Sequence, residues 1–143
     1  ERDLTSPSIA TLIDILECLG TSPRAFFSDD SDKKVVFARS DMFEKDDEQY
    51  GHITWLVPGA QKNTMEPILV TLAPGQATQH YDPHEGEEFG YVLSGSITLH
   101  LDTGKQRVRT GESFCIHPSS VHWLSNAGRS VARFLWVSTP PSF

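Results

Sequence analysis

The sequence predicts an all-β domain preceded by a short α-helical part. From Val35 onward, short runs rich in Val, Ile, Thr and aromatic residues alternate with turn signals such as Pro58-Gly59, Pro74-Gly75 and Thr110-Gly111. No long helical stripe separates these runs, and this pattern is typical of an antiparallel sandwich or barrel. With 143 residues the chain is long enough to bury a core of its own without disulfides.

A helix is predicted over residues 6–19, with Ser6 as its N-cap and Gly20 where the last turn ends. Its apolar residues recur at steps of three and four and form one stripe: Ile9, Leu12, Ile13, Leu16 and Leu19. A second short helix is predicted over Pro23–Phe27, packing its two phenylalanines back on the first. The polar residues 28–34 then mark a joint, and we expect a first domain over 1–30 and a second over 31–143.

The charge balance excludes some partners for this stretch of chain. Its net charge of −7 disfavours binding of nucleic acid by these residues alone, because phosphate binding needs a basic surface. No apolar run approaches the roughly 18 residues expected of a membrane span. The chain starts at Glu1, close to a helical pattern, and we therefore expect a fragment of a longer protein.

The densest group of metal-ligating residue types lies in residues 79–88. If residues 80–84 are extended, His80, Asp82 and His84 share one face, and Gly86 allows a turn that brings Glu88 to them. Imidazole and carboxylate ligands together suit one divalent metal such as iron, manganese, nickel or zinc. The alternative is a polar loop between strands.

A wider spacing favours the metal site. The residues concerned are Gly75, His84, Glu88 and Gly95, followed by Gly111, His122 and Asn126. Their spacing resembles the two motifs of the cupin superfamily. The resemblance implies a double-stranded β-helix, the cupin jelly-roll barrel, with a metal held between the motifs by His84, Glu88 and His122.

One position departs from the cupin pattern. Asp82 stands where the family has its first metal-binding histidine. Three alternatives follow: Asp82 acts as the fourth ligand, His80 substitutes for it through a shifted turn, or the metal is lost and the remaining groups bind an organic ligand directly.

Further side chains complete the expected site and core. Seven aromatic residues fall in predicted strands, and most should fill the core: Trp55, Phe89, Tyr91, Phe114, Trp123, Phe134 and Trp136. We expect Tyr81, Tyr91 and Trp123 to contact the bound ligand. Alternation in residues 96–102 predicts that His100 lies on the surface. Cys18 and Cys115 are expected to be packing residues.

The N-terminal residues carry a second resemblance. Residues 1–22 with Phe26 and Phe27 are similar to the second half of a helix-turn-helix domain of the Xre/Cro type. A remnant of this kind followed by a small cupin resembles a class of bacterial transcription regulators in which the cupin senses a metabolite and helps to dimerise the protein. This resemblance implies a cytoplasmic homodimer without enzymatic activity, a small-molecule effector, no membrane contact, and DNA binding through the missing N-terminal part.

Two other functions remain open at the level of sequence. One is a metal-dependent cupin enzyme, such as an oxygenase or isomerase, with the metal as Lewis acid or oxygen activator. The other is a dimerisation module without a working pocket.

Overall fold

The computed structural model describes residues 8–27 and 34–143 and is dominated by β-strands. Two helices come first, α1 (Ile9–Cys18) and α2 (Pro23–Phe27), and 3₁₀ turns follow at Arg39–Asp41 and Ala60–Lys62. The strands are β1 (Phe43–Asp47), β2 (Gly51–Trp55), β3 (Glu66–Leu72), β4 (Glu87–Ser94), β5 (Ser96–Leu101), β6 (Gly104–Arg109), β7 (Ser113–Ile116), β8 (Trp123–Ser125) and β9 (Ala132–Thr139). The predicted all-β class with a short helical part is confirmed.

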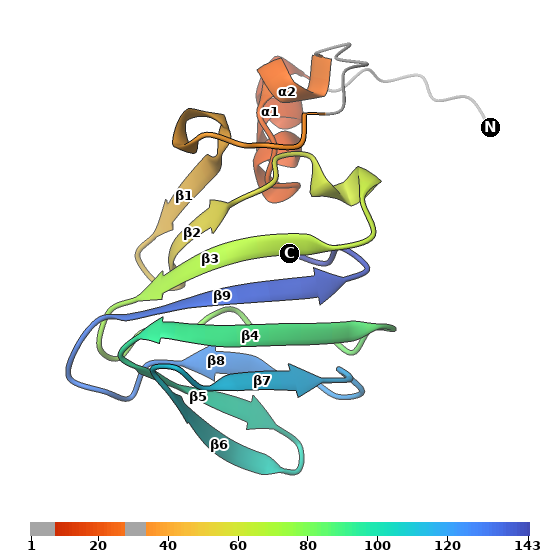
Figure 1. Ribbon diagram of the computed structural model, residues 1–143. Helices are drawn as coiled ribbons and strands as arrows, with labels where there is room; N and C mark the ends of the chain where they lie inside the picture. Colours follow the sequence, from red (N-terminus) through yellow and green to blue (C-terminus); the bar gives the residue numbers. More distant parts are fainter. Residues whose placement is uncertain (1–7, 28–33) are drawn as a thin grey trace.

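The strands form two antiparallel sheets (Figure 1). Six strands pair in the order β1-β2-β3-β9-β4-β7, and three pair in the order β6-β5-β8. Isolated bridges join Ala77 to Ser125 and Tyr81 to His122, so that residues 77–81 run beside β8. The helices lie at one end, above β1 and β2 in Figure 1.

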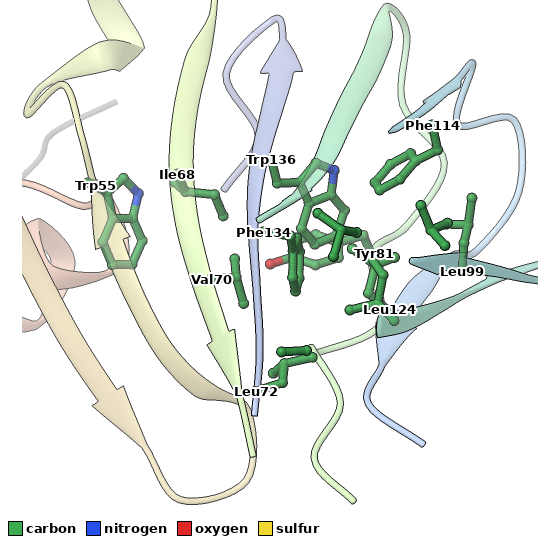
Figure 2. Close-up of a cluster of buried hydrophobic side chains, with 14 residues drawn as sticks. Trp55, Ile68, Val70, Leu72, Tyr81, Leu99, Phe114, Leu124, Phe134 and Trp136 are labelled. Atoms are coloured by element: carbon green, nitrogen blue, oxygen red, sulfur yellow. The ribbon is translucent and has the colours of Figure 1, made fainter. Parts of the chain in front are cut away.

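The core lies between the two sheets. Inward-facing residues of β3 and β9 alternate with outer ones, as in Ile68, Val70 and Leu72, each of which is 0% exposed. These side chains form one cluster with Phe134 of β9 and Leu124 of β8 (Figure 2). Because one cluster takes side chains from both sheets, the strands form a sandwich closed around a shared interior.

The helical part differs from the prediction in its start and its packing. Ser8 caps α1 by accepting a hydrogen bond on Oγ from the Thr11 backbone N–H at 3.1 Å, while the predicted cap Ser6 lies outside the described residues. The end at Gly20 is confirmed by its φ of +61°. Of the apolar stripe only Leu16 is buried, and Phe26 and Phe27 are exposed. These residues have too few neighbours among the described residues to be covered.

The acidic residues 41–49 include β1, an edge strand whose acidic side chains point largely to solvent. Two local predictions were wrong, one on His100 and one on the cysteines. His100 is only 8% exposed, because the ring of Trp123 covers it at a centroid distance of 4.5 Å. Cys115 and Cys18 are exposed rather than packed, since Phe114 and Ile116 take the inner face of β7 and only Leu16 of α1 is buried.

No helix within the described residues is long and apolar enough to cross a membrane.

Candidate metal and effector site

Two segments bring the predicted ligands together inside the sandwich. His84 precedes β4, where its backbone N–H donates to the Pro118 carbonyl at 3.0 Å. Gly86 has a φ of +100°, and a Cβ there would meet the Thr139 carbonyl oxygen, so the turn into β4 requires glycine. Glu88 then faces inward in the alternation of β4.

The third ligand enters from the second sheet. His122 precedes β8, and its backbone is held by two hydrogen bonds with Tyr81, of 2.9 and 3.1 Å. Glu88 and His122 are both 0% exposed. The side chains of His84, Glu88 and His122, which we call the triad, place their donor atoms within 4.8 Å of one another.

Glu88 is the centre of the triad. Its Oε1 lies 3.0 Å from His84 Nε2, and its Oε2 lies 3.2 Å from His122 Nε2. The indole N–H of Trp136 donates to Oε2 at 2.9 Å. One buried carboxylate thus contacts two imidazoles and one indole.

Backbone carbonyls orient both imidazoles. His84 Nδ1 donates to the Glu85 carbonyl at 3.0 Å, and His122 Nδ1 donates to the Ser120 carbonyl at 3.1 Å. Because a carbonyl can only accept, Nδ1 carries the proton in each ring, and Nε2 faces Glu88. This is the arrangement of metal-binding histidines, whose second nitrogen is fixed by a hydrogen bond outside the metal's own shell.

The interior of the triad favours a positive charge. His122 Nε2 is buried and has no hydrogen-bond partner of suitable geometry, although Glu88 is close. Burial lowers the pKa of His122, but the close, negatively charged Glu88 carboxylate and the Ser120 carbonyl outweigh it, and the net direction is upward. Two imidazole nitrogens and a carboxylate fit Zn²⁺, Fe²⁺, Mn²⁺ or Ni²⁺ and leave further coordination positions open.

The structure does not bring the predicted fourth ligand into the triad. Asp82 is exposed, because the side chain of the preceding Tyr81 points into the interior. The next side chain of this segment to be partly buried is that of His84. His80, the substitute, is also exposed and stacks on the ring of Trp123 at 4.2 Å. The triad therefore has three protein ligands among the described residues.

The three predicted ligand-contacting aromatic residues lie in different places. Tyr81 is buried beside the triad, with its ring 5.9 Å from that of His122. Burial raises the pKa of the Tyr81 phenol, and the charge of Glu88 adds to this, so the hydroxyl stays protonated. Tyr91 lies on the outer face of β4, and Trp123 lies on the outer face of β8, both directed away from the triad.

Sequence reasoning missed several residues of the interior. Trp136 was placed in the core without its hydrogen bond to Glu88. Glu66, 0% exposed at the start of β3, and Phe143, which packs on Trp136, were not considered. Glu66 could have been found, because it is a carboxylate directly before a strand of alternating apolar residues. The sequence around Phe143 contains no comparable signal.

Comparisons with known proteins agree with this geometry. The family model described as "Cupin domain" matches residues 68–138. Over 147 residues the chain is 32% identical to the HTH-type transcriptional regulator PuuR of Escherichia coli (strain K12), which covers 100% of this chain and 78% of that protein.

Solved structures share the fold. The cupin domain of an XRE family transcriptional regulator from Enterobacter cloacae has a TM-score of 0.56 and 20% identity, covering 63% of this chain and 96% of that one. The structure named FeII HppE has a TM-score of 0.64 and 21% identity, covering 95% of this chain and 77% of that one. At these identities the likeness shows the fold alone, and it confirms the predicted jelly-roll barrel.

Proposed function

We propose that this chain, which belongs to the family of helix-turn-helix transcriptional regulators that carry a cupin domain, binds a small-molecule effector in its barrel and thereby controls DNA binding by the regulator. The observation that carries the proposal is the triad, a buried set of three ligand-type side chains in a chain of this family. The effector would enter beside Tyr81, which lies against His122.

The triad supports ligand binding because it is costly as a purely structural element. Burying a carboxylate and an imidazole without full hydrogen bonding destabilises a fold relative to apolar side chains of similar size. Glu88 and His122 are both 0% exposed, and His122 Nε2 has no suitably oriented partner. A bound cation would satisfy this nitrogen and the charge of Glu88 together.

In the proposed site His84, Glu88 and His122 hold one divalent metal. When bound, the metal supplies a Lewis-acidic centre with positions open to an oxygen or nitrogen of the effector. The Glu85 and Ser120 carbonyls keep Nε2 of the two histidines directed at it. We assign no catalytic residue, and the proposed role is that of a receptor rather than an enzyme.

Dimerisation and the control of DNA binding belong to the same proposal. The outer face of β4 exposes Phe89, Tyr91 and Leu93, which are 41%, 39% and 47% exposed, and this apolar surface supports pairing with a second copy. An effector changes DNA binding only if it binds one arrangement of the dimer more tightly than the other. The proposal keeps the division at residues 30 and 31 and places the protein in the cytoplasm, where its DNA is.

The test uses the regulator with its DNA-binding part and a duplex from upstream of its own gene. A panel of amines, carboxylic acids and sugars is screened by thermal shift with metal-loaded protein, and the same panel is then added to a DNA-binding titration at one fixed salt concentration. We expect the compounds that stabilise the protein to be those that change DNA affinity, and both effects to vanish in His122→Ala. Failure of the regulator to bind DNA, or effects that persist in His122→Ala, would contradict the proposal.

A matched control separates loss of the site from loss of the fold. His117 follows β7 and lies outside the triad; its side chain is 78% exposed and is 3.2 Å from the exposed carboxylate of Glu87. His117→Ala should therefore respond to the panel as the unchanged protein does.

A further inference from the structure

A second buried carboxylate lies in the same interior as the triad. Glu66 of β3 pairs with Ser138 of β9, and Ser138 also pairs with Glu88 of β4. All three are 0% exposed and form one inward-facing row across three adjacent strands. With neighbouring strands about 4.8 Å apart, Glu66 and Glu88 lie roughly 10 Å from each other.

Residues 140–143 of the same chain bind the Glu66 carboxylate. The backbone N–H groups of Ser142 and Phe143 both donate to Glu66 Oε2, at 3.1 and 2.9 Å. Ser138 Oγ donates to the Pro140 carbonyl at 2.7 Å and lies 2.6 Å from Ser142 Oγ. Since Ser138 has a single hydroxyl proton, Ser142 is the donor in the second contact.

The ring of Phe143 fills the space next to the triad. It lies 4.8 Å from the ring of Trp136 and 5.7 Å from that of Tyr81. These same two residues border the triad on its other side, since Tyr81 stacks on His122 and Trp136 donates to Glu88. Two surface cavities formed by described residues, of about 680 and 650 Å³, are lined by residues outside the triad.

The segment therefore binds the barrel in the manner of a ligand. It donates two backbone N–H groups to the buried Glu66 carboxylate and packs the Phe143 ring on the rings of Trp136 and Tyr81. Burial raises the pKa of Glu66, and the hydrogen bonds from Phe143, Ser142 and the Trp55 side chain offset only part of this. An apolar residue at position 66 would fill the core without that cost, so the carboxylate is best explained by what it binds.

We propose that Glu66, Tyr81 and Trp136 form a second ligand subsite beside the triad, occupied by residues 140–143 until a ligand with an N–H donor next to an aromatic or bulky apolar group displaces them. Protonated amines and amides share this chemistry. At this subsite, anionic ligands without such a donor are rejected, because the buried Glu66 carboxylate is the group that they would face. The proposal rests on the proposed function in one respect, that the barrel is the effector's binding site.

Competition by the segment gives a measurable consequence. If the segment fills the subsite most of the time, weakening it tightens apparent binding of a probe by the inverse of the free fraction, roughly tenfold for a site that is one-tenth free. The probes are benzylamine, phenylacetamide and phenylacetate, which share a ring and differ in their polar group. Binding is measured by calorimetry on the metal-free full chain, where no metal in the triad can bind the phenylacetate carboxylate, and it does not involve DNA.

We expect Phe143→Ala to bind benzylamine or phenylacetamide roughly tenfold more tightly than the unchanged chain, and neither protein to bind phenylacetate. The double variant Phe143→Ala with Glu66→Gln should lose benzylamine binding. Phe89→Ala, which removes an exposed ring from the outer face of β4, should bind as the unchanged chain does. Equal probe affinity in the unchanged chain and a folded Phe143→Ala, or binding that survives Glu66→Gln, overturns the proposal.

A second measurement needs no substitution. Hydrogen exchange at the Ser142 and Phe143 amides should become faster when benzylamine saturates the unchanged chain. The probe replaces the hydrogen bonds that these two amides donate to Glu66. Unchanged protection of both amides under saturation overturns the proposal as well. Either negative result leaves the DNA titrations untouched, whereas loss of effector-dependent DNA binding with intact probe binding would count against the proposed function alone.

Discussion

At the scale of single residues, one carboxylate organises the candidate site. Glu88 lies within 3.2 Å of two histidine Nε2 atoms and accepts the indole N–H of Trp136. Carbonyls behind His84 and His122 fix which nitrogen each ring presents. The side chains are therefore oriented before any ligand arrives, which lowers the entropic cost of binding.

His100 gives a prediction for the pH dependence of stability. Burial lowers its pKa, and the positive charges of Lys105 and His80 lower it further. A histidine whose folded-state pKa is depressed contributes stability that is present above the unfolded pKa and lost as the pH falls through the folded value. We expect the free energy of unfolding to decrease less between about pH 7 and about pH 5 in His100→Phe than in the unchanged protein.

The measurement is denaturant unfolding at a series of pH values. The control is Phe89→Leu, which changes an exposed side chain of β4 that carries no titratable group. This control should follow the pH course of the unchanged protein. If His100→Phe follows that same course, the burial of His100 has no energetic consequence and the prediction is wrong.

At the scale of elements, β4 carries the packing that closes the barrel. Its inward positions are Glu88, Gly90 and Val92, of which Gly90 has no side chain because the ring of Phe114 on β7 occupies that space. A Cβ at position 90 would lie 2.1 Å from the Phe114 ring. The close approach of β4 and β7 keeps Glu88 in register with Ile116.

Gly90→Ala should therefore destabilise the fold. Overpacking of a well-filled core costs about 1–3 kcal/mol, and the same loss is expected in the free energy of unfolding measured with urea. Ser113→Ala, at an exposed position of β7, is the control and should change the stability by less than about 0.5 kcal/mol. A Gly90→Ala protein as stable as the control would mean that the ring of Phe114 moves aside at little cost.

Sequence patterns predicted some of these elements and not others. Period-two alternation predicted the strand around Ile97, and the resemblance to the cupin motifs implied that His84, Glu88 and His122 share one site. The pattern failed where long-range contact decides the outcome. His100 is buried by the ring of a residue on another strand, and Phe143 reaches the core through a fold-back, and neither leaves a local signature.

At the scale of the whole molecule, two of the surfaces formed by the described residues carry several exposed apolar side chains. One is the outer face of β4, and the other is the helical part, where Ile9 is 79% and Phe27 is 67% exposed. The domain boundary at residues 30 and 31 stays a prediction. The triad and Glu66 lie in the interior between the sheets, away from both surfaces.

The outer face of β4 gives a prediction for assembly. Tyr91→Asp places a charge in the middle of the apolar surface formed with Phe89 and Leu93, and desolvating that charge in an interface is unfavourable. We expect the unchanged chain to sediment as a dimer in analytical ultracentrifugation and Tyr91→Asp to sediment as a monomer. Glu85→Ala, at an exposed position outside β4, should remain dimeric. A dimer that is unaffected by Tyr91→Asp places the contact elsewhere.

The central claim is that the barrel holds a divalent metal through the triad. The most direct test is elemental analysis of the chain after incubation with Zn²⁺, Mn²⁺, Fe²⁺ or Ni²⁺ and removal of free ions. We predict about one ion per chain for the unchanged protein and for His117→Ala, and a large loss for folded His84→Ala and His122→Ala. Metal-free unchanged protein, or equal metal content in the triad variants, would contradict this account.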